Sequence, residues 1–153
     1  MDRYLLDTNA FNNILDNDVI DAVVLHAQGR IYATHHQTEE INNTKNETRR
    51  AHLATCFRVV GPQDVPTESF MLGFSRLGHA RLGDGDCCRA IYWALEKCAR
   101  KTNNAHDALI GETAEKGGFT LVSDDGALRE VMTGRGVRVI GWRQLVCELA
   151  RRR

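Results

Sequence analysis

Short apolar segments that alternate with longer amphipathic segments restrict the fold of this chain more than any other feature. The short segments have the length and composition of buried strands, and the longer ones carry apolar residues at helical spacing. A repeated strand–helix order with short connections predicts an α/β fold with a mostly parallel sheet of about five strands flanked by helices. The strands are expected at residues 3–6, 30–33, 57–60, 119–122 and 137–140.

Start and stop signals place the helices between these strands. Gly29 follows one helix as a C-cap, and Thr34 is a good N-cap for the next, which we expect to run toward Ala54. Glycines and aspartates in residues 82–86 form the clearest break in the chain, and a strongly amphipathic helix follows them. Further helices are expected over residues 11–15, 18–27, 67–74, 104–114, 128–132 and 142–149.

Length and composition are those of one globular domain covering residues 1–153. The 20 basic and 20 acidic residues cancel, so the net charge gives no evidence for a nucleic-acid partner. Five cysteines, an odd number without a Cys-x-x-Cys pair, favour a reducing compartment. The chain shows neither a signal-peptide pattern nor an apolar run near the ~20 residues that cross a bilayer, so we expect a cytoplasmic protein without a membrane segment.

Carboxylates lie at or near several helix starts and strand ends. In an α/β fold the carboxyl ends of parallel strands and the adjacent helix starts converge on one crevice, so these side chains are expected to meet. Mg²⁺ and Mn²⁺ prefer oxygen ligands, and gathered acids cost stability unless a cation or protons occupy the cluster. The sequence therefore suggests a divalent-metal site built from Asp7, Glu40, Asp86, Asp107 and Asp125.

Each of these acids also has an ordinary structural explanation. Asp7 could cap the first helix, and Asp107 could interact with a helix dipole from a first turn. Glu39 is an equal rival of Glu40 on composition alone, and residues 124–125 could form a plain turn. Each explanation is satisfactory for a single acid. Together they account less well for a set of acids that recurs on alternating strands and helices.

Two histidines lie at a spacing from glutamate that zinc ligands use. His35 with Glu39 and His36 with Glu40 lie four residues apart on one expected helix, a spacing at which each pair could bind zinc. No further His or Cys pair has matching spacing, so the sequence argues against a zinc site. His106 is interpreted only as a residue that lines the acidic crevice.

At these positions the chain resembles the PIN domain family of metal-dependent ribonucleases, and in size the VapC-type toxins of toxin–antitoxin pairs. Residues 5–9, Leu-Leu-Asp-Thr-Asn, look like the family's opening strand and first acid. Residues 38–41, Thr-Glu-Glu-Ile, resemble its second motif, in which the acid directly precedes an apolar residue. Residues 107–114 closely match the third motif, and residues 121–125 resemble the strand that ends in Thr/Ser-x-Asp/Asn. Residues 83–86 are similar to a Gly-Glu motif with aspartate in place of glutamate.

The resemblance covers nearly the whole chain and implies a three-layer α/β/α sandwich, Mg²⁺ or Mn²⁺ as one or two bound ions, and endonucleolytic cleavage of RNA. It favours Glu40 over Glu39 and makes Asp86 an assisting residue. Asn9 and Ser123 would orient ligands or water by hydrogen bonds. The implied metal ligands are Asp7, Glu40, Asp107 and Asp125.

The resemblance also suggests two protein partners, a small antitoxin lying over the acidic crevice and a second copy of the chain in a homodimer. Phe70, Met71 and Phe74 could supply the apolar dimer surface or only fill the core. RNA would bind through basic residues that border the crevice. The candidates are Arg76, Arg81, Arg89, Lys97 and Arg100.

Other interpretations were compared with this one. A phospho-receiver module needs a phosphorylatable Asp after its third strand, whereas the strand expected at residues 57–60 ends in Gly61-Pro62. A haloacid-type phosphatase needs Asp-x-Asp where this chain has Asp7-Thr8-Asn9. A PIN-type RNA-processing nuclease is compatible with the same motifs. A catalytically silent RNA-binding PIN module is also compatible, although retention of all the acids speaks against it.

Overall fold

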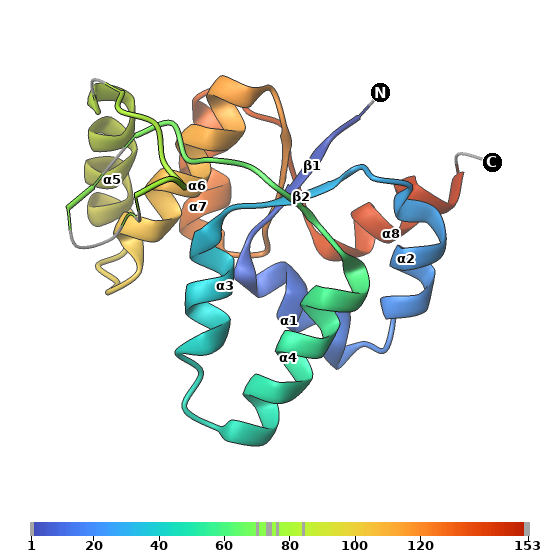
Figure 1. Cartoon of the computed structure of the whole chain (residues 1–153). Coiled ribbons are helices and arrows are strands. Elements are labelled where there is room, and N and C mark those ends of the chain that lie inside the picture. Colours follow the sequence, from blue (N-terminus) through green and yellow to red (C-terminus); the bar gives the residue numbers. More distant parts are fainter. Residues whose placement is uncertain (1, 70, 73–74, 76, 84, 152–153) are drawn as a thin grey trace.

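A five-stranded, all-parallel sheet forms the centre of the molecule (Figure 1). The computed structural model describes residues 2–69, 71–72, 75, 77–83 and 85–151. Its strand order is β3-β2-β1-β4-β5, which confirms the predicted α/β class and the number of strands. The strands are β1 (Tyr4–Leu6), β2 (Ile31–Ala33), β3 (Gln63–Asp64), β4 (Thr120–Val122) and β5 (Val139–Ile140).

Helices cover both faces of the sheet. In the described residues they are α1 (Thr8–Asp16), α2 (Ile20–Ala27), α3 (His35–Asn42), α4 (Glu47–Val60), α5 (Asp86–Cys98), α6 (Asn104–Gly117), α7 (Gly126–Gly134) and α8 (Trp142–Arg151). Successive strand residues point to opposite faces. Tyr4, Leu6 and Val122 pack with α1, α2, α4 and α8, whereas Leu5 and Leu121 pack with α5, α6 and α7. This is the three-layer α/β/α sandwich that the PIN resemblance implies.

Two boundaries predicted between residues 34 and 64 are wrong. The expected helix from Thr34 is two helices, because α3 ends at Asn42 and the Asn46 side chain caps α4 by accepting the Arg49 N–H. The expected strand 57–60 is the last turn of α4, whose buried residues Leu53, Cys56 and Val60 follow helical spacing. The third strand is instead β3, an exposed pair of residues at the sheet edge.

Residues 57–60 are helical, so the end of that segment gives no evidence against a phospho-receiver, and the order of the strands decides the question instead. Asp64 does end the third strand, but that strand lies at the edge of the sheet. In the flavodoxin-like order 2-1-3-4-5 the third strand is central. The observed order 3-2-1-4-5 is therefore a different topology, and it excludes the receiver arrangement.

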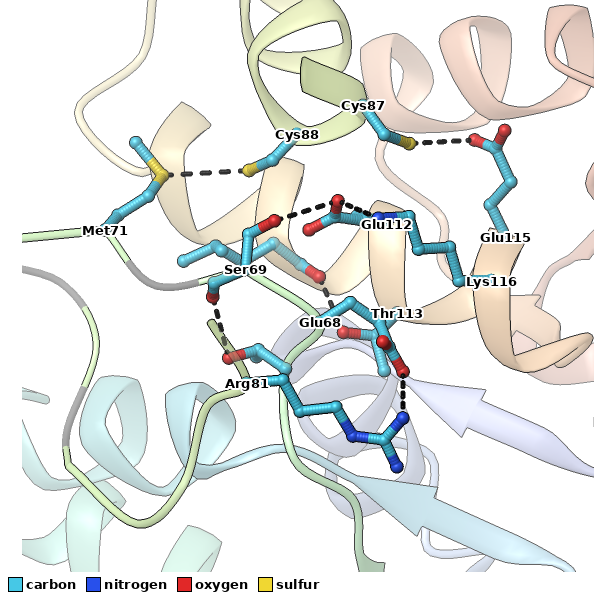
Figure 2. Close-up of polar contacts among 12 residues, drawn as sticks. Glu68, Ser69, Met71, Arg81, Cys87, Cys88, Glu112, Thr113, Glu115 and Lys116 are labelled. Carbon is cyan, nitrogen blue, oxygen red and sulfur yellow. Dashed lines mark hydrogen bonds and ion pairs between the residues drawn. The ribbon is translucent and has the colours of Figure 1, made fainter. Parts of the chain in front are cut away.

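A helix is expected from Thr67, but the described residues of this segment, 67–69 and 71–72, are not helical. Thr67 N–H donates to the His79 carbonyl at 3.0 Å, and Arg81 N–H donates to the Thr67 carbonyl at 2.7 Å. Ser69 Oγ donates to Glu112 on α6 at 2.9 Å, so buried polar contacts replace helical ones (Figure 2). Met71, one of the expected dimer residues, is partly buried against the cluster around α5 and α6. Phe70 and Phe74 lie outside the described residues.

None of the helices formed by the described residues is long and apolar enough to cross a bilayer.

Candidate metal centre

The acidic pocket opens where the sheet topology reverses direction. From β1 the chain moves outward to β2 and β3, then returns to place β4 on the other side of β1. A ligand crevice is expected outside the carboxyl ends of strands at such a point. A cavity of about 470 Å³ lies there, with Asp7 beyond β1 and Asp125 beyond β4 in its lining. Its other lining residues are Thr8, Asn9, Asn12, Glu40, Asn43, Thr44, Thr102, Asn103, His106 and Asp107.

Asp7 is held rigidly at the base of this pocket. It caps α1 by accepting the backbone N–H groups of Asn9 and Ala10, and it accepts the Ser123 hydroxyl at 2.5 Å. The Asp7 residue is only 4% exposed. Burial raises the pKa of Asp7 to about 6 against these hydrogen bonds, and the charge of Glu40 adds to the rise. The Asp7 side chain can therefore cap α1 and also serve as a metal ligand.

Asp107 lies in the first turn of α6 and is the most strongly perturbed acid of the pocket. It is 6% exposed. Burial raises the pKa of Asp107 to about 8, and the charges of Asp7, Glu40 and Asp125 contribute in that order. A raised carboxyl pKa means that the surroundings do not stabilise the ionised carboxylate as well as water does. The pocket therefore favours a cation or a proton at Asp107.

Asp125 and Ser123 come from the turn after β4. Asp125 caps α7 by accepting the Leu128 N–H at 3.0 Å, and it pairs with Lys101 from the loop before α6. Burial is the largest single influence and raises the pKa of Asp125, but the contacts with Lys101 and the backbone outweigh it and leave the pKa below its usual range. The Asp125 carboxylate is thus neutralised by a basic side chain of the protein, Lys101.

Glu40, rather than Glu39, faces the pocket from α3. Its carboxylate accepts the Thr8 hydroxyl, and its Oε1 lies 3.5 Å from His106 Nδ1. Glu39 is directed to a different neighbour, with its Oε2 3.7 Å from His36 Nδ1. Helical geometry separates adjacent residues by about 100°. The two glutamates of the second motif therefore serve different clusters.

The remaining predicted site residues divide into two groups. Asn9 lines the pocket, and its side-chain oxygen accepts the Asp124 N–H at 3.1 Å, which joins the turns after β1 and β4. Asp86 does not line this pocket. It begins α5, with a side chain that is 80% exposed and an oxygen 3.8 Å from Arg89. The structure brings together Asp7, Asn9, Glu40, Asp107 and Asp125, with Ser123 bonded to Asp7, and leaves Asp86 apart.

The four predicted RNA-binding residues that the structure describes lie outside the pocket lining. Arg81 is near Glu68 at 3.4 Å and Arg100 is near Glu96 at 3.9 Å, so both have local carboxylate partners. Arg89 pairs with Asp86, and Lys97 is exposed in the last turn of α5. Arg76 lies outside the described residues. The basic side chain that reaches the acids is Lys101, whose place in a run of basic residues gave no signal of this contact.

No family model matches the sequence, and no curated protein matches it. Among solved structures, the chain is similar to PAE2754 from Pyrobaculum aerophilum, with 18% identity over 99% of this chain and 98% of that one, and a TM-score of 0.67. FitAcB from Neisseria gonorrhoeae matches at 17% identity over 91% of this chain and 97% of that one, with a TM-score of 0.44. At this identity, the first likeness supports the PIN-like fold and says nothing about activity.

Proposed function

We propose that the chain is a Mg²⁺- or Mn²⁺-dependent endoribonuclease that hydrolyses RNA phosphodiester bonds. The observation that carries the proposal is the convergence of four carboxylates, from four different elements, on one open pocket. Two of them, Asp7 and Asp107, are buried with raised pKa values. The motif resemblance to PIN ribonucleases supplies the choice of RNA as substrate.

The donor set of the pocket fits a hard divalent cation. Carboxylate, hydroxyl and amide oxygens dominate its lining, and these are the donors that Mg²⁺ and Mn²⁺ prefer. Asp7, Glu40, Asp107 and Asp125 would hold one or two ions directly or through water. Bound there, the cation supplies positive charge that neutralises the phosphodiester and lowers the pKa of a water nucleophile.

The chain's own contacts prepare the pocket for this chemistry. Ser123 and the first turn of α1 fix the Asp7 carboxylate, and Lys101 restrains Asp125. Second contacts of this kind commonly orient metal ligands. Asn103 and Thr102, on the loop that leads into α6, offer hydrogen-bond donors beside the acids, where a phosphate or ribose would lie.

RNA outside the pocket would be held by Arg81, Arg89, Lys97 and Arg100, with Arg76 as a further candidate. Arg89 and Lys97 lie on α5, and Arg81 and Arg100 lie on either side of it in the chain. Phosphate binding by basic side chains is driven by counterion release. Affinity for RNA should therefore fall steeply with salt. A binding constant that does not change with salt concentration would remove these residues from the proposal.

Cleavage by the purified chain tests the proposal. RNA should be cut in Mn²⁺ and left intact in chelator, and Asp7→Asn should lose most of the activity while keeping the fold. Asp21→Asn is the matched control, since Asp21 is an exposed aspartate on α2 and does not line the pocket. Equal rates for the parent and Asp7→Asn would refute the assignment of the pocket.

In the cell, the resemblance to VapC-type toxins leads us to assign the chain to a toxin–antitoxin pair. A small antitoxin would cover the acidic pocket with a basic side chain, and the chain would act as a homodimer. Expression should slow bacterial growth, Asp7→Asn should abolish that effect, and co-expression of the neighbouring upstream gene should restore growth. Harmless expression of a chain that is active in vitro would favour an RNA-processing nuclease instead.

A further inference from the structure

Four histidine rings form a continuous row beside the acidic pocket. His79 stacks on His35 with ring centroids 5.4 Å apart, and the centroids of His35 and His36 are 4.0 Å apart. His36 in turn lies 4.7 Å from His106, which lines the pocket. The row therefore leads from the loop after β3, across the first turn of α3, to the acids.

His36 is the least easily explained member of this row. It is 0% exposed, and neither of its ring nitrogens has a hydrogen-bond partner among the described residues. Its Nδ1 lies 3.7 Å from the Glu39 carboxylate, which is too long for a hydrogen bond. A buried polar group without a partner is costly, so a native structure that retains one invites an explanation.

His35, His36 and Glu39 have the arrangement of metal ligands. One ligand atom from each residue lies within 4.8 Å of the others. Two ligands of a tetrahedral zinc ion, with bonds of ~2.0–2.1 Å, are about 3.4 Å apart, so the 3.7 Å between His36 Nδ1 and Glu39 Oε2 is close to the bound separation. The other two separations between ligand atoms are within 4.8 Å, so each needs to shorten by at most about 1.4 Å to reach the bound separation.

We propose that His35, His36 and Glu39 bind a transition-metal ion, preferably Zn²⁺, at a site separate from the acidic pocket. Two imidazoles and one carboxylate suit zinc, whereas the all-oxygen pocket suits Mg²⁺ or Mn²⁺. The fourth position is filled by water or by His79. The ion supplies the partner that His36 lacks and fixes α3, the helix from which Glu40 reaches the acidic pocket. This inference does not depend on nuclease activity.

The ligand spacing differs from the one that the sequence suggests. The sequence offers pairs four residues apart, whereas the structure places His36 near Glu39, three residues on, and adds the adjacent His35. Adjacent helical residues ordinarily diverge. Their convergence here occurs in the first turn, directly after the Thr34 cap, where the sequence alone gives no basis for expecting it.

Zinc binding by the whole chain in excess Mg²⁺ tests this site, because Mg²⁺ occupies the carboxylate pocket and competes poorly for imidazole. Competition with a chromophoric chelator should give one tightly bound Zn²⁺ per chain. Co²⁺ should give visible absorption of a low-coordinate nitrogen–oxygen site without a thiolate charge-transfer band. Absence of Zn²⁺ binding, or a thiolate band from the free cysteines, would overturn the proposal.

Matched variants locate the ion. His35→Asn and Glu39→Gln should each weaken Zn²⁺ binding by more than about tenfold, since even outer partners of a metal site contribute about 10–100-fold. His52→Asn and Glu47→Gln, at exposed positions on α4, should leave it unchanged. Circular dichroism checks that each variant is folded. Equal weakening by the α4 variants, or no weakening by the α3 variants, would contradict the assignment.

Discussion

Two acids on the same helix, Asp107 and Glu112 of α6, are both buried and are stabilised in opposite ways. Glu112 is 0% exposed, and it accepts the Ser69 hydroxyl at 2.9 Å and pairs with Lys116 at 3.0 Å (Figure 2). Asp107 has other carboxylates as its main electrostatic neighbours, with Lys101 as a weaker opposing influence. Both belong to the motif at residues 107–114, yet Glu112 has a cation from its own helix, whereas Asp107 faces other acids and, under the proposed function, would take its cation from solution.

Burial of an acid is therefore not by itself a sign of a metal-binding site. A carboxylate with an internal cation and a hydroxyl donor holds a loop in place, as Glu112 holds the segment that follows β3. A carboxylate close to other carboxylates is destabilised by their charges, and a bound metal ion would remove that repulsion. The two acids should therefore respond in opposite ways to neutralisation.

The largest expected effect is on activity. Asp107→Asn should lower RNA cleavage by about a hundredfold or more, because removing a metal ligand costs at least as much as removing an outer partner, about 10–100-fold. Glu112→Gln should keep the activity per folded molecule, since Glu112 lies outside the pocket lining. Initial cleavage rates in Mn²⁺, normalised to folded protein, make the comparison. Equal losses in the two variants would erase the distinction between the two acids.

The next largest effect is on stability, where the Glu112 variant should lose more than the Asp107 variant. Glu112→Ala leaves the buried Ser69 hydroxyl without its acceptor and removes the contact with the partly exposed Lys116, so it should lower the free energy of unfolding by about 1–3 kcal/mol. Asp107→Asn in chelator should cost nothing or increase stability, because it removes mutual repulsion. Urea unfolding of both variants in chelator measures this difference. If Asp107→Asn were destabilised and Glu112→Ala were not, the proposed difference between the two acids would be wrong.

The pH dependence should reveal the stored repulsion. Burial and neighbouring acids raise the pKa of Asp107 to about 8 from 3.8, so between these values the folded state holds a proton that the unfolded state has lost. Stability from this group is present below pH 3.8 and is lost as the pH rises through about 8. Asp7 contributes likewise up to about 6, and His36, whose pKa burial lowers to about 3 from 6.5, acts in the opposite direction below 6.5.

The clean window for this measurement therefore lies between pH 6.5 and about 8, where Asp107 dominates these three groups. Unfolding free energy in chelator should fall with pH across this window in the parent chain. The fall should be shallower in Asp107→Asn and should persist in Glu112→Gln. An identical slope in the parent and in Asp107→Asn would show that Asp107 ionises without penalty.

The smallest effect expected is a shift in melting temperature with metal. Mn²⁺ that binds only the folded state stabilises it by RT ln(1 + [L]/K_d). The melting temperature of the parent chain should rise with Mn²⁺, and Asp7→Asn should show a smaller rise. A rise of the same size in both proteins would place the bound Mn²⁺ elsewhere.

The parts of the fold that the sequence predicted are those with a local apolar signal. Residues 4–6, 31–33 and 120–122 are buried strands, and their spacing within a strand–helix repeat was enough to indicate a parallel sheet. The strand β3 carries no apolar pattern, since it is held by backbone pairing of Gln63 and Asp64 to β2. Its position could not be found by periodicity.

The candidate site was predictable to a similar extent. Parallel topology brings strand ends together, so the convergence of Asp7 and Asp125 follows from the order of elements. The contact of Lys101 with Asp125 depends on a loop path that no local pattern encodes. The same is true of the hydrogen bond from Ser69 to Glu112, which joins residues 43 positions apart.

The central claim, that the acidic pocket binds a divalent metal and thereby cleaves RNA, is tested most directly by a single Mn²⁺ titration. Bound Mn²⁺, measured from the loss of the free-ion electron paramagnetic resonance signal, and the RNA cleavage rate are recorded on the same samples. The account predicts that the two rise together and that Asp7→Asn lacks both. Cleavage that persists at full rate in chelator, or a saturated pocket that cuts no RNA, would contradict it.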